Sequence, residues 1–133
     1  MITGLEGVLA GVGPDWADVS VGGVTIRASI PESASGTMGP AGERVRLFTS
    51  LQVRDDSLTL YGFPTEDART AFEALIGING VGPRLALSIL SAMTTDSLAL
   101  AIDSADPGAF KGVSGVGTKT ANRIVLELKG KLD

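Results

Sequence analysis

A short internal repeat limits the possible folds of this chain more than any other feature. Residues 75–89 read LIGINGVGPRLALSI and residues 110–124 read FKGVSGVGTKTANRI, an offset of 35 positions with six identities in fifteen. The identical positions are Gly77, Gly80, Val81, Gly82, Ala86 and Ile89, matched by Gly112, Gly115, Val116, Gly117, Ala121 and Ile124. Each copy ends an apolar helical segment, turns at Gly-Val-Gly and starts a new helix. The repeat therefore predicts two helical hairpins built alike.

The chemistry that such a hairpin offers is anion binding. Two glycines let backbone N–H groups turn outward with no Cβ in the way. The following helix adds its unpaired N–H groups and the positive end of its dipole. Arg84 and Lys119 place a cation in the first turn of each helix. A nucleic-acid phosphate fits there without any reading of bases. We expect Val81 and Val116, between the glycines, to anchor each hairpin in the core.

The residues before position 63 have the pattern of β-strands. Short runs rich in Val, Ile, Leu and Thr alternate with turn signals such as Gly22-Gly23, and the stretch Pro31–Gly42 is expected to be a turn. The predicted strands are Ile2–Ala10, Ala17–Val21, Val24–Ile30, Arg44–Val53 and Leu58–Phe63. Five short strands predict a small closed barrel, with the OB-fold as the first candidate and an SH3-like barrel as the alternative.

The periodicity changes from two to 3.6 after Phe63, which predicts helices. Thr65 caps the first helix, Pro83 starts a second that runs over Arg84–Ala92, and Thr94 or Thr95 starts a third. A short helix over Asp106–Lys111 and a longer one from Thr118 to about Lys129 complete the prediction. We therefore expect a barrel domain over residues 1–62 and a domain of two helical hairpins over residues 63–133.

Composition narrows the chemistry, because the 133 residues include no Cys and no His. The absence of Cys excludes disulfides, thiolate metal sites, iron–sulfur clusters and a Cys nucleophile. The absence of His excludes imidazole acid–base chemistry and the usual zinc sites. No run reaches the roughly 18 apolar residues of a membrane span. Together these absences argue against most hydrolase mechanisms. We expect a cytoplasmic protein without metal, cofactor or membrane contact.

The distribution of charge matters more than its sum. The net charge of −4 argues against nucleic acid when taken alone. Residues 1–62, however, carry four basic and seven acidic side chains, whereas residues 107–131 carry a single acid, Glu127. The basic residues of that second range are Lys111, Lys119, Arg123, Lys129 and Lys131. An acidic total can therefore coexist with a basic surface that binds DNA.

The repeat resembles the helix-hairpin-helix motif of DNA-binding proteins. Two copies after a five-stranded barrel, with VRDDSLTLYGF over residues 53–63, resemble the RuvA family, which binds Holliday junctions. The resemblance covers essentially the whole chain. It implies a non-catalytic homotetramer, with an octamer on DNA as a further possibility, that holds a four-way junction open for the RuvB motor in recombination and DNA repair. The RuvC resolvase is a further partner that it suggests.

The resemblance also assigns roles to residues of this sequence. The phosphate-contacting positions it implies are Gly80, Val81, Gly82 and Arg84 in hairpin one, and Gly115, Val116, Gly117, Thr118, Lys119 and Arg123 in hairpin two. Asp55 and Asp56 would form an acidic pin at the tetramer centre. Thr118 departs from the family, where a basic residue is common. The family's third domain, which contacts RuvB, has no counterpart before Asp133, so motor binding is assigned to none of these residues.

The acidic pair has two interpretations. Asp favours turns, so Asp55 and Asp56 alone predict a solvated hairpin turn. In the setting that the resemblance implies, two carboxylates near phosphates cost electrostatic energy. They would discourage continuous duplex from crossing the centre, whereas the strands of a junction can part around them. Specificity would then come from exclusion.

Two other functions remain open at this point. The segment GVGTKTAN over residues 115–122 also resembles the hairpin of base-excision DNA glycosylases, in which a Lys at this position can be the nucleophile. The chain is short for enclosing a flipped base, as such an enzyme must. The hairpins could also serve protein association or RNA binding only. Cleavage of a damaged duplex, and binding of junction DNA, discriminate these alternatives.

Overall fold

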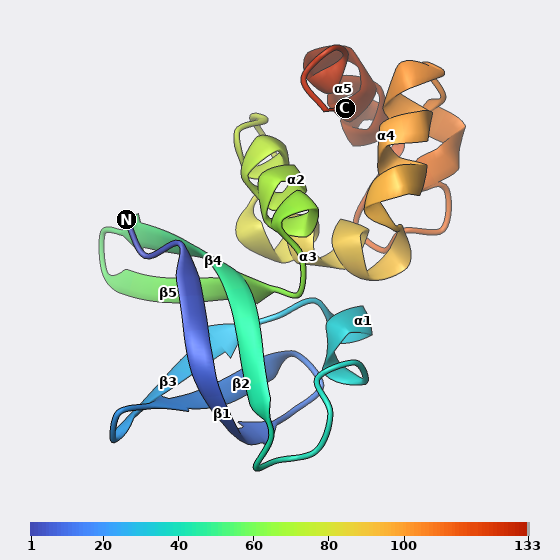
Figure 1. Ribbon diagram of the computed structural model, residues 1–133. Coiled ribbons are helices and arrows are strands. Elements are labelled where there is room, and N and C mark those ends of the chain that lie inside the picture. The colour runs from blue at the N-terminus through green and yellow to red at the C-terminus, as the bar shows by residue number, and fades with distance from the viewer. Residues whose placement is uncertain (133) are drawn as a thin grey trace. The chain divides into compact units, whose positions relative to one another are not determined.

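The computed structural model describes residues 1–132 and divides into two compact units, residues 1–69 and the residues from Thr70 onward. The first unit contains five strands, which Figure 1 labels. They are β1 (Gly4–Val12), β2 (Trp16–Val21), β3 (Val24–Ser29), β4 (Arg44–Arg54) and β5 (Ser57–Phe63). All five predicted strands are therefore confirmed, with ends that differ by one or two residues. The predicted domain division between residues 62 and 63 stays a prediction.

The five strands close into a barrel in the order β1-β2-β3-β5-β4. Neighbouring strands are antiparallel except β3 and β5, which are parallel and meet at Ser29 and Tyr61. Gly22-Gly23 forms the β2–β3 turn, with φ of 56° and 91°, and Val21 pairs with Val24 across it. The single pair of Ser29 and Tyr61 closes the barrel between β3 and β5. The predicted OB-like five-stranded barrel is confirmed.

The barrel core follows from alternation along the strands. In β1, Leu5 and Leu9 are buried while their neighbours face outward, as the period of two requires. Val19 and Leu47 meet them from β2 and β4 in one apolar cluster. Gly7 allows β1 to approach β2 closely, because a Cβ there would collide with the carbonyl of Ser20. The apolar alternation thus determines which face of each strand points inward.

The stretch predicted as a turn over Pro31–Gly42 contains a single helical turn, α1 (Glu32–Ser35). Pro31 precedes it in an extended conformation, and Glu32 supplies the acidic first turn that a helix favours. Ala34 is buried in the barrel core. The stretch connects β3 to β4 as expected, and its helical turn was not predicted, because four residues are too few to produce a helical period in a sequence.

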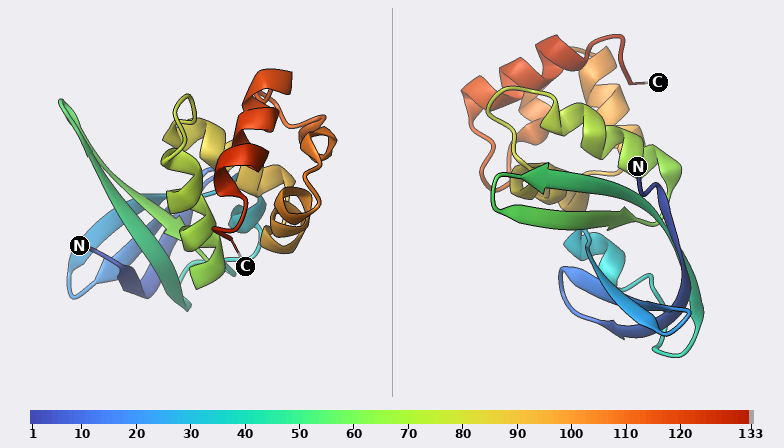
Figure 2. Two further views of the ribbon diagram at one scale, coloured as in Figure 1. Left: turned by 90° about the horizontal axis from the view of Figure 1, so that it is seen from above. Right: turned by 90° about the vertical axis from the view of Figure 1, so that its left-hand side faces the viewer.

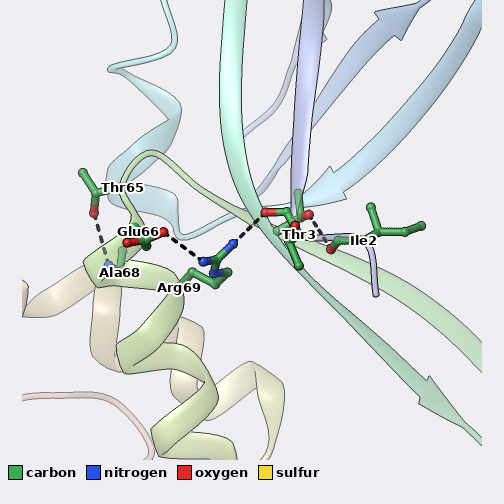
Figure 3. A network of polar contacts seen from close by, with 7 residues as sticks. Ile2, Thr3, Thr65, Glu66, Ala68 and Arg69 are labelled. Carbon is green, nitrogen blue, oxygen red and sulfur yellow. Dashed lines mark hydrogen bonds and ion pairs between the residues drawn. The ribbon is translucent and has the colours of Figure 1, made fainter.

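A polar network fixes the start of α2 (Glu66–Ile76) within the first unit (Figure 3). The Thr65 hydroxyl accepts from the N–H of Ala68 at 3.1 Å, which confirms the predicted cap. The Arg69 guanidinium donates to the carbonyl oxygen of Thr3 at 2.7 Å and pairs with Glu66 at 3.3 Å. The first turn of α2 is therefore bound to the chain segment that enters β1.

The second unit is built from helices that pack around an apolar centre. Beyond α2 these are α3 (Pro83–Ala92), α4 (Thr95–Asp103), the 3₁₀ turn η1 (Pro107–Phe110) and α5 (Thr118–Leu128). The predicted helices are confirmed, and Thr94 caps α4 by accepting from the N–H of Ser97 at 3.0 Å. Within residues 1–132 no single helix has the length and apolar character of a membrane span; only α3 and α4 together, bent by 99°, reach both.

Ala105 is the only non-glycine residue with positive φ among residues 1–132, at 52°. Its N–H donates to Ile102 and that of Asp106 donates to Ala101, the pattern of a helix end that favours glycine. We expect Ala105→Gly to raise the free energy of unfolding by about 0.5–1 kcal/mol, because relief of the left-handed strain exceeds the added chain entropy. Urea denaturation measures it, and a loss of stability would contradict this reading of the helix end.

Candidate nucleic-acid interface

Hairpin one joins α2 to α3 through residues 77–82. Gly80 adopts φ of 94°, a left-handed conformation that favours glycine. The N–H of Val81 donates to the carbonyl oxygen of Ile78 at 3.0 Å, and Val81 is buried. Gly82 is the N-cap of α3, with φ of −91° and ψ of 176°. The chain thus turns sharply at Gly80 and enters the helix at Gly82.

Hairpin two repeats this geometry between η1 and α5. Gly115 has φ of 88°, and the N–H of Val116 donates to the carbonyl oxygen of Val113 at 3.1 Å. Gly117 is the N-cap of α5, with φ of −90° and ψ of −180°. Each of these positions lies 35 residues after its counterpart in hairpin one. From the left-handed glycine to the N-cap, the sequence repeat is therefore also a repeat of backbone conformation, whereas Gly112 has positive φ and its counterpart Gly77 does not.

The two glycines of each Gly-Val-Gly turn have different reasons to be glycine. Gly80 and Gly115 need positive φ, which other L-residues adopt only with strain. Gly82 and Gly117 have extended backbone that any residue adopts. Apart from the adjacent residues of the chain, no described residue has an atom within 4 Å of a Cβ built on either. Neither conformation nor internal space requires glycine at these two positions. The open space beside them suits the close approach of another molecule.

The backbone donors of both loops indicate that this molecule is an anion. No backbone acceptor for the N–H of Gly82 or Gly117 lies in residues 1–132. The first N–H groups of α3 and α5 add further unpaired donors and a positive dipole end. Arg84 and Lys119 are exposed in these first turns. Each loop therefore presents amide donors and one cation, the set that holds a phosphate.

The two hairpins differ at the first residue of the second helix. Pro83 has no N–H, so α3 offers one donor fewer at this position. Thr118 at the equivalent place in α5 is exposed and supplies both an N–H and a hydroxyl. Hairpin two therefore offers two neutral donors at this position, where hairpin one offers none.

Contacts between the hairpins place both loops side by side. The Arg123 guanidinium of α5 donates to the carbonyl oxygen of Asn79 in hairpin one at 3.0 Å. In the other direction, the Cδ1 of Leu85 in α3 lies 3.1 Å from a Cβ built on Gly115. Both loops are exposed at their glycines. The predicted phosphate-binding segments therefore adjoin one another within the second unit.

The predicted anchoring of both hairpins by their central valines is only half correct. Val81 is buried, whereas Val116 is half-buried. The cause is the segment before hairpin two, where η1 with Pro107 and Gly108 stands in place of a full helix and leaves a pocket of about 300 Å³. Val116 lines this pocket.

Ile78 and Val113, which the sequence reasoning missed, are equivalent loop residues that are buried in both hairpins. Each accepts, through its carbonyl oxygen, the hydrogen bond that closes its loop. A signal for them existed, because both are apolar at equivalent positions of the repeat.

The predicted acidic pair forms the tip of the β4–β5 hairpin, which reaches beyond the other strands of the barrel (Figure 2). Asp55 and Asp56 are exposed between the paired residues Arg54 and Ser57. Val53 and Leu58, which pair behind them, are 70% and 68% exposed. Among residues 1–132 no three acidic side chains are grouped to hold a metal ion. The tip thus presents two carboxylates on an apolar stem.

A second charged cluster belongs to the barrel wall. Arg27 of β3 binds Asp18 of β2 at 2.7 Å, and its guanidinium lies 4.0 Å from the centre of the Trp16 ring. The hydrogen bond from Arg27 holds the pKa of Asp18 below its usual value, and the same bond raises the pKa of Arg27. This cluster joins neighbouring strands, and neither hairpin loop contributes to it.

Known protein families match both parts of the chain. Residues 1–62 match the family described as "RuvA N terminal domain". Residues 72–131 match the family described as "SAM-like Helix-hairpin-helix tandem". The first match covers the five strands with the acidic turn, and the second covers both glycine loops.

Curated relatives match nearly the whole chain. A protein of Dehalococcoides mccartyi is 44% identical over 132 residues, which are 99% of this chain and 68% of the relative. Proteins of Chloroflexus aggregans and Roseiflexus sp. are each 45% identical over 133 residues, all of this chain and 68% of the relative. All three are named Holliday junction branch migration complex subunit RuvA.

Proposed function

The chain belongs to the RuvA family, and from this premise we propose that it binds four-way Holliday junctions by their structure and holds them open for branch migration. The observation that carries the proposal is the pair of adjoining glycine loops in the second unit. Each combines an exposed N-cap glycine, unpaired amide donors and a cation. Such loops bind phosphates and read no bases, so binding is independent of sequence.

The phosphate-binding residues of this proposal follow the two loops. Hairpin one contributes Gly80, Val81, Gly82 and Arg84, and hairpin two contributes Gly115, Val116, Gly117, Thr118 and Lys119. The valines contribute by shaping the loops, since the N–H of each already donates to a carbonyl oxygen of its own loop and their side chains are buried and half-buried. Arg123 is not among the phosphate-binding residues, because its guanidinium already binds within the protein.

The acidic tip supplies the preference for a junction. In a homotetramer, four copies of the β4–β5 hairpin would bring Asp55 and Asp56 together at the axis as an acidic pin. Carboxylates near phosphates raise the electrostatic energy, more so where water is partly excluded. A continuous duplex would have to cross this charge, whereas the strands of an open junction part around it. The protein would therefore prefer a junction because the acidic tip repels a continuous duplex.

The protein acts in this proposal as a non-catalytic subunit in the cytoplasm. Holding the junction needs only phosphate contacts and the acidic pin, so neither cofactor nor metal is required. The energy for branch migration comes from a motor partner, RuvB, and a resolvase partner, RuvC, would process the same junction. The names of the relatives support a place in the branch migration complex, and through it in recombination and repair.

A gel-shift titration with a four-way junction, against a linear duplex of equal length and composition, tests the proposal. We expect tighter binding of the junction, unchanged when its arm sequences are exchanged. A parallel incubation with duplex containing a damaged base should give no cleavage. Equal affinity for junction and duplex would overturn the proposal.

Two cations should control the salt dependence of binding. Arg84→Ala and Lys119→Ala each remove a charge at a loop, and we expect each to reduce the slope of log affinity against log salt by about one. Lys129→Ala is the matched control, because it removes one charge at the opposite end of α5. Fluorescence anisotropy at several salt concentrations measures the slopes. An unchanged slope in both loop variants would refute phosphate contact by these residues.

A further inference from the structure

Arg123 belongs to the second helix of hairpin two, yet its guanidinium binds the loop of hairpin one. Its Nη1 donates to the carbonyl oxygen of Asn79 at 3.0 Å, a contact between residues 44 positions apart. The same nitrogen lies 3.6 Å from a Cβ built on Gly80. Its Nε lies 3.9 Å from the Glu127 carboxylate one turn along α5. The side chain thus lies over the peptide that joins Asn79 to Gly80.

The geometry of a peptide unit gives this contact a consequence. The carbonyl of Asn79 and the N–H of Gly80 belong to one planar trans unit, in which they point in opposite directions. When Arg123 holds the carbonyl on its own side, the N–H of Gly80 must point to the other side. No backbone acceptor for that N–H lies among the described residues. Arg123 thereby sets the direction of one donor of hairpin one.

Leu85 makes the reverse contact. It belongs to the second helix of hairpin one, and its Cδ1 reaches the positive-φ glycine of hairpin two, 3.1 Å from a Cβ built on Gly115. Each loop is thus held at its left-handed glycine by a side chain from the other hairpin. A hydrogen bond from a cation holds hairpin one, and an apolar contact holds hairpin two.

We propose that Arg123 is a positioning residue that holds hairpin one in its phosphate-binding shape. This inference rests on the proposed function and refines it, because the family resemblance implies that Arg123 is a phosphate contact of hairpin two. Part of its donor capacity is used by Asn79, and Glu127 lies near its charge. Its effect on DNA passes through the Asn79–Gly80 peptide, and Lys119 remains the cation of hairpin two.

Hydrogen exchange in the free protein tests the inference without DNA. The reporters are two equivalent amides, Val81, which donates to Ile78, and Val116, which donates to Val113. In Arg123→Ala we expect the Val81 amide to exchange about tenfold faster, the effect expected from removing a hydrogen bond with a charged donor, with Val116 unchanged. In Leu85→Ala we expect the Val116 amide to exchange faster, with Val81 unchanged. Ser88→Ala, at the position of α3 equivalent to Arg123, is the matched control and should change neither.

Junction affinity supplies the second readout, as a double-mutant cycle. If Arg123 acts through hairpin one, the double variant Arg123→Ala with Arg84→Ala should lose less affinity than the product of the two single fold-reductions. In the double variant Arg123→Ala with Lys119→Ala, the loss of affinity should equal the product of the two single fold-reductions. Thermal melting of each variant checks that the fold is intact.

Two outcomes would overturn the inference: an unchanged Val81 amide in Arg123→Ala, or reductions in affinity that multiply with Arg84→Ala and not with Lys119→Ala. Failure of the wild-type protein to prefer a junction is a different result. It would refute the proposed function and leave the exchange result for Val81 as it stands.

Discussion

Gly82→Ser and Gly117→Ser, made together, should leave the chain folded and weaken junction binding by about a hundredfold. Serine adopts the extended N-cap conformation of both positions without strain, and its hydroxyl accepts from the N–H groups of its own helix. The same hydroxyl withdraws those donors from a phosphate and fills the open space beside them. Removing one charge-assisted hydrogen bond to DNA at each loop weakens binding about tenfold or more, so the two substitutions together approach a hundredfold.

The measurement compares melting temperature with junction affinity in the same preparation. We expect a melting temperature equal to or above that of the wild type, because a serine cap stabilises a helix more than glycine does. Gly115→Ala is the contrasting variant, since φ of 88° and the nearby Leu85 leave no relaxed place for a Cβ. It should lower the free energy of unfolding by about 1–3 kcal/mol. Wild-type junction affinity in the double serine variant would show that the open space is not a phosphate site.

Asp55→Asn with Asp56→Asn should raise duplex affinity relative to junction affinity by about tenfold. Asparagine has nearly the same shape and also favours turns, so the tip of the β4–β5 hairpin keeps its conformation. Both aspartates are exposed, and their neutralisation should leave the melting temperature unchanged. At a few ångströms from a phosphate, each charge costs about 1 kcal/mol in water and more where water is partly excluded. The expected change in preference follows from removing that cost.

The control for this variant removes the same charge elsewhere on the barrel. Asp15→Asn with Glu43→Gln neutralises two exposed acids outside the β4–β5 hairpin. A general effect of net charge on DNA binding would appear in both double variants. An acidic pin that acts by its position would appear only in the first. A ratio of junction to duplex affinity that is the same in all three proteins would contradict the exclusion mechanism.

Much of the fold was predictable because its local signals agree with one another. Gly22-Gly23 between two runs of valine and isoleucine predicts a tight hairpin, and the structure has it. Pro83 and Thr94 start their helices for backbone reasons that do not depend on distant contacts. The single turn of α1 escaped prediction, because burial of Ala34 in the barrel and not a helical period holds it. Local sequence signals were thus sufficient to predict elements whose conformation does not depend on tertiary packing.

The candidate site was predictable in composition but not in detail. The repeat identifies the loop glycines, yet it does not separate Gly80, which needs positive φ, from Gly82, which does not. That distinction appears only in the backbone. The exposure of Val116 depends on the short η1 turn before it, and the partner of Arg123 lies 44 residues away. Contacts made across the fold leave no trace in the spacing of the residues concerned.

Hydrogen–deuterium exchange of the intact chain, with and without a four-way junction, tests the central claim most directly. The claim is that both glycine loops bind phosphates through their amides. Peptides that cover residues 78–86 and 113–121 should both exchange more slowly in the complex, while the Gly22-Gly23 turn of the barrel should be unaffected. Protection confined to the barrel, or absent from both loops under conditions in which the junction is bound, would contradict the account.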